Sequence, residues 1–130
     1  MADESPLILI VDDEEAFHEI AKTVLEAGGY RTTEAFNGEE GVKKAKDLRP
    51  DLVLMDMKMP KMTGAEALEG LRNQEETKDT PVIFLTNFGD PRVEFASDKH
   101  FAEQVGAKDF LSKSKIAEEL LSKVKNILRS

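Results

Sequence analysis

Cysteine is absent from this chain of 130 residues, so disulfide bonds and thiol chemistry are excluded and neither redox compartment is favoured. Long apolar runs are also absent, since no stretch approaches the roughly 20 residues that a membrane-spanning helix requires. The first six residues, Met-Ala-Asp-Glu-Ser-Pro, lack the basic and apolar regions of a signal peptide. These absences predict a cytoplasmic protein that does not enter a membrane.

Positive charge is in deficit. The chain has 18 Lys and Arg residues against 26 Asp and Glu residues, which gives a formal net charge of −8. Direct binding of nucleic acid needs clustered positive charge to neutralise phosphates, so we do not expect it. A protein partner with a basic surface is compatible with this charge. The length suits one domain over residues 1–130, with a flexible tail at about residues 1–5.

Short apolar runs alternate with helical patterns along the chain. The predicted strands are Leu7–Val11, Tyr30–Phe36, Leu52–Met55, Pro81–Leu85 and Lys108–Leu111. The predicted helices are one ending near Ala27 with Phe17, Ile20, Ala21, Val24 and Leu25 on its apolar stripe, then Glu39–Leu48, Ala65–Asn73 and Lys115–Leu128. Tyr30–Phe36 is the most polar strand, so we place it near a sheet edge. The segment Phe88–Val105 is less clear, although Asp90-Pro91 is a good helix start.

The alternation of strands and helices predicts the fold class. Strands separated by helices form parallel sheets with right-handed crossovers and helices on both faces. We therefore expect an α/β fold of the (βα)₅ type, which is a doubly wound five-stranded parallel sheet.

Polar side chains follow four of the predicted strands. Asp12 and Asp13 come after the first strand, and Asp56, Thr86 and Lys113 come after the third, fourth and fifth. Parallel strands share one carboxyl edge, where open α/β sheets bind ligands, so we expect these side chains to converge. Three carboxylates this close repel one another unless a cation holds them. An all-oxygen cluster without His or Cys favours Mg²⁺, with Mn²⁺ or Ca²⁺ as alternatives.

The remaining two side chains of the cluster point to a reaction. Lys113 supplies a compact positive charge and Thr86 a hydroxyl donor, as an anionic group at the site would require. A metal ion, a lysine and a hydroxyl around a carboxylate fit phosphoryl transfer to that carboxylate, which forms a mixed anhydride.

Three other functions compete with this interpretation. A flavin-binding domain of the same fold would place glycines and hydroxyls after the first strand, where the acids at 12–15 would instead repel phosphate. An aspartyl-phosphate hydrolase typically carries a second acid two residues after its nucleophile, and that position is Lys58. A domain that only binds protein without being phosphorylated would not need the intact acids, threonine and lysine.

The stretch from Asp56 to Gly64 reads Asp-Met-Lys-Met-Pro-Lys-Met-Thr-Gly and carries a specific pattern, Asp-x-x-Met-Pro-x-Met-x-Gly. With it in register are Asp12, Asp13, Thr86, Phe110 and Lys113. Over nearly its whole length the chain resembles the receiver domains of two-component response regulators. The resemblance implies the flavodoxin-like strand order 2-1-3-4-5 of a chemotaxis receiver.

The resemblance also implies roles for particular residues. Asp56 is the phosphoacceptor. Mg²⁺ is ligated by Asp13, Asp56 and the backbone carbonyl of Lys58, with Asp12 helping through water. Lys113 pairs with the phosphoryl oxygens. Thr86 moves to bind them and, with Phe110, forms the switch.

The implied function is that of a signalling switch. A sensor histidine kinase or a phosphotransfer protein donates the phosphoryl group from a phosphohistidine, and an unknown downstream protein recognises the changed surface. The domain would catalyse its own phosphorylation and dephosphorylation, but it would act as a signalling switch rather than as a turnover enzyme.

Two positions and the length of one segment depart from the family pattern. Ser114 replaces the proline that usually follows Lys113, and we predict a trans bond there because a cis bond without proline costs roughly 2.5–4 kcal/mol. Phe110 lacks the hydroxyl of the commoner tyrosine. The interval between Thr86 and Lys113 is longer than usual, with the extra residues between Asn87 and Val105.

The two histidines, His18 and His100, are predicted to lie at the surface or the core edge without a metal role.

Overall fold

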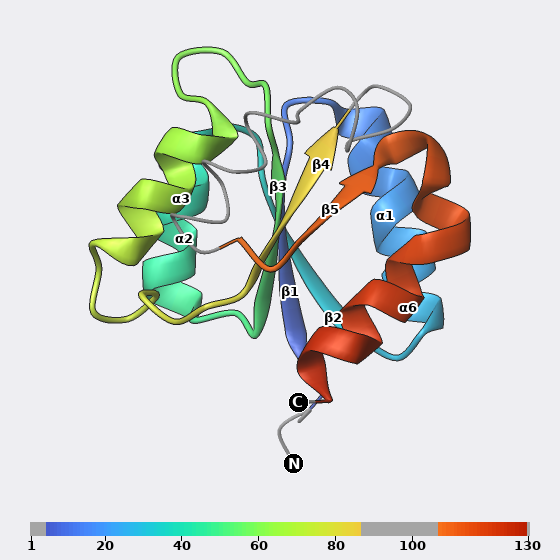
Figure 1. Ribbon diagram of the computed structural model, residues 1–130. Coiled ribbons are helices and arrows are strands. Elements are labelled where there is room, and N and C mark those ends of the chain that lie inside the picture. The colour runs from blue at the N-terminus through green and yellow to red at the C-terminus, as the bar shows by residue number, and fades with distance from the viewer. Residues whose placement is uncertain (1–4, 87–106, 130) are drawn as a thin grey trace.

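The computed structural model describes residues 5–86 and 107–129, which form a parallel sheet covered by helices on both faces (Figure 1). The five strands have the order β2-β1-β3-β4-β5, and every neighbouring pair is parallel. The predicted fold class and the 2-1-3-4-5 order are therefore confirmed.

The predicted strands and helices within the described ranges are present, with bounds that differ by about one residue. The strands are β1 (Leu7–Val11), β2 (Arg31–Ala35), β3 (Leu52–Asp56), β4 (Val82–Thr86) and β5 (Asp109–Ser112). The helices are α1 (Glu15–Ala27), α2 (Gly38–Leu48), α3 (Gly64–Arg72) and α6 (Ile116–Leu128), the last preceded by a 3₁₀ turn at Lys113–Lys115. The segment Phe88–Val105, with Asp90-Pro91 and His100, and most of the predicted N-terminal tail lie outside the described residues.

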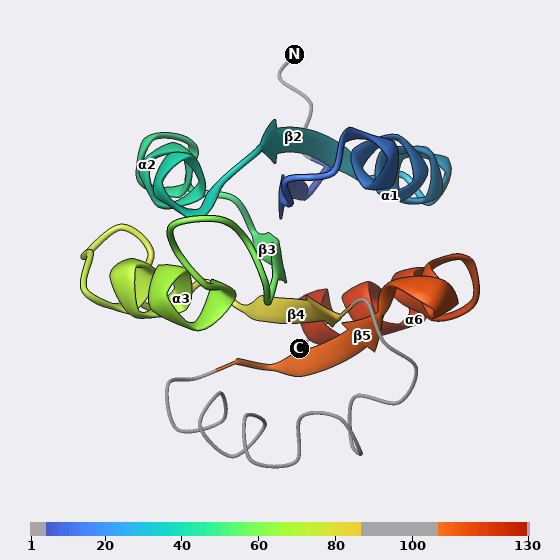
Figure 2. The same ribbon diagram turned by 90° about the horizontal axis from the view of Figure 1, so that it is seen from above.

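Two apolar cores, one on each face of the sheet, hold the layers together. Successive strand residues point to opposite faces, so Leu9 and Val11 pack toward α2 and α3, while Ile8 and Ile10 pack toward α1 and α6. Figure 2 shows the two helix pairs on either side of the sheet. All residues of β3 and β4 are buried. The edge strand β2 is mostly half-exposed, as its polar sequence predicts.

Helix α1 differs from its predicted orientation. Its buried side chains are Phe17, His18, Ala21 and Leu25, whereas Ile20 is 49% exposed. A helix turns about 100° per residue, so a buried His18 rotates the inward face away from Ile20. The prediction that Ile20 is inward is therefore wrong. Of the two places predicted for His18, its burial excludes the surface, and its contacts with Asp12 and with Glu34 of the edge strand fit the core edge.

Within the described ranges, no helix has the length and apolar character needed to cross a membrane.

Candidate functional site

The structure brings the polar residues that follow the strands together at the carboxyl edge of the sheet. Asp12, Asp56 and Thr86 are buried there, with exposed fractions of 0%, 1% and 1%, and Asp13 is exposed. One carboxylate oxygen from each of Asp12, Asp13 and Asp56 lies within 4.8 Å of the others. Three acids from two strands therefore surround one small volume.

Lys113 closes this cluster from the far end of the sheet. Its Nζ lies 2.5 Å from Asp12 Oδ2 and 3.6 Å from Asp56 Oδ2. The same Nζ lies 2.9 Å from Glu14 Oε1 and 4.7 Å from the centre of the Phe17 ring. The described residues contain no cis peptide bond, so the Lys113–Ser114 bond is trans, as predicted.

The contacts that Glu14 and Phe17 make with Lys113 were missed by the sequence analysis. Glu14 and Lys113 are 99 positions apart in the sequence. From the sequence, an acid at position 14 is explained equally well as a favourable charge at the start of α1. The strand order alone could have suggested the contact, because it places the end of β5 across β4 and β3 from the start of α1.

Two hydrogen bonds at the end of β1 hold the backbone N–H and one carboxylate oxygen of Asp12. The Asp12 N–H donates to the Ala35 carbonyl at 3.1 Å, and Asp12 Oδ1 accepts a hydrogen bond from the Glu14 N–H at 2.8 Å. Asp12 Oδ2 is left to face Lys113. The turn from β1 into α1 therefore aims this carboxylate into the cluster.

The loop after β3 positions Asp56. The Met57 N–H donates to the Leu85 carbonyl at 3.1 Å, and the Gly64 N–H donates to the Met57 carbonyl at 3.0 Å. A Cβ atom at Gly64 would lie 2.4 Å from the backbone oxygen of Asp56, so only glycine fits this approach. Lys58 lies in this loop and its N–H donates to Asp56 Oδ1 at 3.2 Å. The role predicted for the Lys58 carbonyl stays a prediction.

Helix α3 begins where this loop ends. The Thr63 side chain accepts from the Glu66 N–H, and the Glu66 side chain accepts from the Thr63 N–H, which together form a capping box. The cap fixes the end of the loop at Thr63, and the hydrogen bond from the Gly64 N–H to the Met57 carbonyl ties this end back to the start of the loop.

Burial dominates the protonation of the cluster. It raises the pKa of Asp56 to about 6, with the Asp12 charge adding to the effect and Lys113 opposing it. Burial also raises the pKa of Asp12, an effect that the nearby Lys113 ammonium opposes. Burial alone would lower the pKa of Lys113, but the carboxylates of Asp12 and Glu14 outweigh it and raise this pKa, so the ammonium remains charged.

The cluster fits a hard divalent cation. Asp12 Oδ2 and Asp56 Oδ2 are buried and accept no hydrogen bond from any described residue, although Lys113 faces both. Their lone pairs and the exposed Asp13 carboxylate form an oxygen-only donor set, which Mg²⁺ prefers. A cation here would also offset the cost of burying two carboxylates.

Thr86 and Phe110 lie on the neighbouring strands β4 and β5. Thr86 ends β4 opposite Ser112 in the pairing register. Phe110 is buried on the side of the sheet that faces α2 and α3, with its ring centre 5.8 Å from that of Phe84. Thr86 thus ends the strand beside that of Asp56, and Phe110 lies on the next strand along. Their predicted switch roles stay predictions.

Comparisons with known proteins agree with this geometry. A family model for the response regulator receiver domain matches residues 8–125. The polar-differentiation response regulator DivK of Brucella anthropi is 31% identical over 121 residues, which cover 93% of this chain and 94% of DivK. The DNA-binding dual master transcriptional regulator RpaA of Synechocystis sp. is 37% identical over 124 residues, which cover 95% of this chain and 49% of RpaA. The chain spans about half the length of the first curated relatives that it matches.

A solved structure carries the same fold with a metal ion. It is the receiver domain of the sensor histidine kinase PA1611 from Pseudomonas aeruginosa PAO1, with magnesium coordinated in its active site cleft. The similarity has a TM-score of 0.84 at 28% identity and covers 97% of this chain and 99% of the other. The family model spans all the strands and helices described above except the first residue of β1 and the last residues of α6. The chain therefore belongs to the response regulator receiver domains, the phospho-accepting domains of two-component signalling.

Proposed function

We propose that this single domain accepts a phosphoryl group on Asp56, in a Mg²⁺-dependent transfer from a phosphohistidine. The donor is a sensor histidine kinase or a phosphotransfer protein. The observation that carries the proposal is the buried Asp56 Oδ2, which accepts no hydrogen bond from a described residue and lies 3.6 Å from Lys113 Nζ.

The transfer exchanges one bond to phosphorus for another. A carboxylate oxygen of Asp56 attacks the phosphorus atom while the bond from phosphorus to the donor imidazole breaks. The imidazole nitrogen keeps the electron pair of that bond, and the ring leaves neutral when its other nitrogen is protonated. Attack by water on the resulting acyl phosphate releases inorganic phosphate and restores the carboxylate.

The chain's own groups supply the environment of this reaction. Asp12, Asp13, Asp56 and the Lys58 carbonyl would hold the cation, with Mn²⁺ as a substitute for Mg²⁺. When bound, the ion supplies charge that neutralises the carboxylates and the phosphoryl oxygens. Lys113 stays protonated and exchanges its contact with Asp12 for a phosphoryl oxygen.

The switch would start from the new charge on Asp56. Phosphorylated hydroxyl side chains carry roughly −1.5 to −2 charges and strong acceptor oxygens, and an acyl phosphate resembles them. The Thr86 hydroxyl donates to one of these oxygens, which draws Thr86 inward and changes the packing of Phe110 beside it. Such an element biases a surface toward or away from a downstream protein partner.

The net charge and the relatives bear on whether nucleic acid is a partner of this domain. RpaA is a DNA-binding protein by name, but it is about twice as long as the part matched here. The net charge of −8 leads us to propose that this domain itself does not contact nucleic acid. We propose a cytoplasmic location, where two-component partners would reach the domain.

The experiment measures the phosphoryl content of the purified protein by intact mass after incubation with acetyl phosphate. One phosphoryl group per chain is expected with Mg²⁺ and none in EDTA. Asp56→Asn should remain unlabelled, whereas Asp47→Asn should label like the unchanged protein, because Asp47 is an exposed acid on α2 that pairs with Lys43. Full labelling of Asp56→Asn, or of the unchanged protein in EDTA, would refute the proposal.

A further inference from the structure

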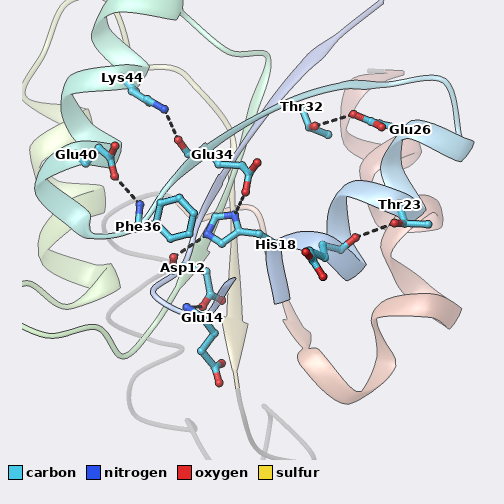
Figure 3. Close-up of polar contacts among 11 residues, drawn as sticks. Asp12, Glu14, His18, Thr23, Glu26, Thr32, Glu34, Phe36, Glu40 and Lys44 are labelled. Atoms are coloured by element: carbon cyan, nitrogen blue, oxygen red, sulfur yellow. Dashed lines mark hydrogen bonds and ion pairs between the residues drawn. The ribbon is translucent and has the colours of Figure 1, made fainter. Parts of the chain in front are cut away.

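His18 is a buried titratable residue that the phosphoryl chemistry does not use. It is 1% exposed and lies in the first half of α1. Figure 3 shows its ring between the end of β1 and the edge strand β2, with Asp12, Glu34 and Phe36 around it. A histidine in such a position either fills space or holds its neighbours in place.

The contacts of the ring differ on its two sides. Nε2 lies 2.7 Å from the backbone oxygen of Asp12, and because a carbonyl oxygen only accepts hydrogen bonds, Nε2 must carry the proton. Nδ1 lies 3.2 Å from Glu34 Oε2, at ion-pair distance but without the alignment of a hydrogen bond. The ring centre lies 4.3 Å from that of Phe36.

The carbonyl that accepts this hydrogen bond belongs to the peptide that joins Asp12 to Asp13. The Asp12 N–H is held by the Ala35 carbonyl and the Asp12 carboxylate by the Glu14 N–H. The hydrogen bond from His18 restrains a third group of Asp12, its backbone carbonyl, which belongs to the peptide that leads into Asp13. Rotation of this peptide plane would redirect the Asp13 side chain relative to that of Asp12.

We infer that His18 is a positioning residue for the acidic cluster, whose Nε2–H holds the Asp12–Asp13 peptide so that both carboxylates converge on one cation. The inference rests on the proposed metal-dependent function. Helix α1 would then orient the acidic cluster in addition to packing on the sheet. The inference predicts that the donor at the Nε2 position, rather than the ring or its Nδ1 contact, determines the metal affinity.

Four variants separate the parts of the imidazole. His18→Gln places an amide N–H near the position of Nε2, whereas His18→Asn places it near the position of Nδ1. His18→Phe keeps the ring beside Phe36 without any donor. Glu34→Gln removes the charged partner of Nδ1 and leaves the contact of Nε2 with Asp12.

The experiment is a calorimetric titration of each purified variant with Mg²⁺. Groups that orient metal ligands typically contribute about 10–100-fold in affinity, so His18→Asn and His18→Phe should lose at least tenfold. His18→Gln and Glu34→Gln should stay within about threefold of the unchanged protein. In metal-free protein, the amide NMR signal of Asp13 should shift in the Asn and Phe variants and stay in place in the Gln variant.

A second measurement distinguishes positioning from a general structural role. Urea unfolding in EDTA gives the stability of each variant, and a residue that only packs would make Mg²⁺ affinity follow stability across the series. That outcome, or equal affinities of the Asn and Gln variants, overturns the inference. If His18→Asn fails to fold, the comparison of His18→Phe with His18→Gln carries the same contrast. Absence of Mg²⁺ binding by the unchanged protein overturns the proposed function as well, whereas binding with equal Asn and Gln affinities overturns this inference alone.

Discussion

Asp56 combines two demands that conflict at the scale of a single residue. A nucleophile for phosphorus must be ionised, yet burial raises the pKa of this carboxyl to about 6. Lys113 opposes the shift but stands closer to Asp12, at 2.5 Å, than to Asp56, at 3.6 Å. A bound cation would resolve the conflict because it favours the ionised form.

The raised pKa predicts how stability depends on pH in the metal-free protein. The folded state binds the Asp56 proton more tightly than the unfolded state does, so its contribution is full below pH 3.8 and is lost as pH rises through about 6. At about 1.4 kcal/mol per pH unit, the loss has an upper limit of about 3 kcal/mol. Asp56→Asn should lack it. Urea unfolding in EDTA at a series of pH values measures this difference, and parallel curves for the two proteins would contradict the raised pKa.

Asp13 and Asp12 should differ in their effect on metal affinity. Asp12 is already engaged by the Glu14 N–H and by Lys113, whereas the exposed Asp13 has its carboxylate available to the ion. We expect Asp12→Asn to cost about 10–100-fold in Mg²⁺ affinity, as changes around metal ligands do, and Asp13→Asn to cost more. Calorimetric titration compares the two, and an equal loss would argue against Asp13 as the direct ligand.

At the scale of elements, the loop between β3 and α3 is held by a close approach of backbone to backbone. The Cβ atom of an alanine at Gly64 would meet the Asp56 carbonyl oxygen at 2.4 Å and the Met57 Cα at 3.0 Å. Backbone atoms cannot rotate away as a side chain does, so the loop itself must shift. Asp56 is the residue that this shift would displace.

Gly64→Ala is therefore expected to destabilise the protein and to slow phosphorylation from acetyl phosphate. Overpacking typically costs about 1–3 kcal/mol. Gly70→Ala is the matched control in the same helix, because its Cβ meets only the end of the Val42 side chain at 3.2 Å and alanine favours a helix by about 1 kcal/mol over glycine. Urea unfolding should show a loss for the first variant and little change or a gain for the second. Similar effects of the two would mean that the approach at Gly64 does not constrain the loop.

The strands β4 and β5 form the element through which the site would reach a partner. Binding of beryllofluoride with Mg²⁺, as a phosphoryl mimic, should change the NMR signals of Thr86 and Phe110 and the amide signals of residues 87–105. Thr86→Ala should keep the changes in the Asp56 loop and lose those at Phe110, since the hydroxyl is the proposed link. Changes that stay within the Asp56 loop of the unchanged protein would show that this switch does not operate here.

At the scale of the whole molecule, the sequence predicted the layers well because strand and helix periods differ. The apolar runs Leu7–Val11 and Leu52–Met55 are short and bounded by turn residues, which favours strands buried on both faces, and the carboxyl-edge position of Asp56 followed from parallel pairing. The strand order came from the resemblance to receiver domains and not from periodicity, since helix-linked strands allow several orders.

What the sequence could not show depends on contacts across the fold. Hydrophobicity alone predicts an apolar stripe on α1 with Ile20 inward. The buried His18 rotates that face, and its two polar contacts come from β1 and β2. The contact between Glu14 and Lys113 joins residues 99 positions apart, and no local sequence pattern predicts such a contact.

The most direct test of the proposed site identifies the residue that carries the phosphoryl group. Borohydride reduces an aspartyl phosphate to homoserine, which peptide mass spectrometry locates in the sequence. After incubation with acetyl phosphate and Mg²⁺, we expect homoserine at position 56 and at no other aspartate, and none when EDTA replaces the metal. Reduction at Asp12 or Asp13, or reduction at position 56 without metal, would contradict the assignment of Asp56 as the metal-dependent phosphoacceptor.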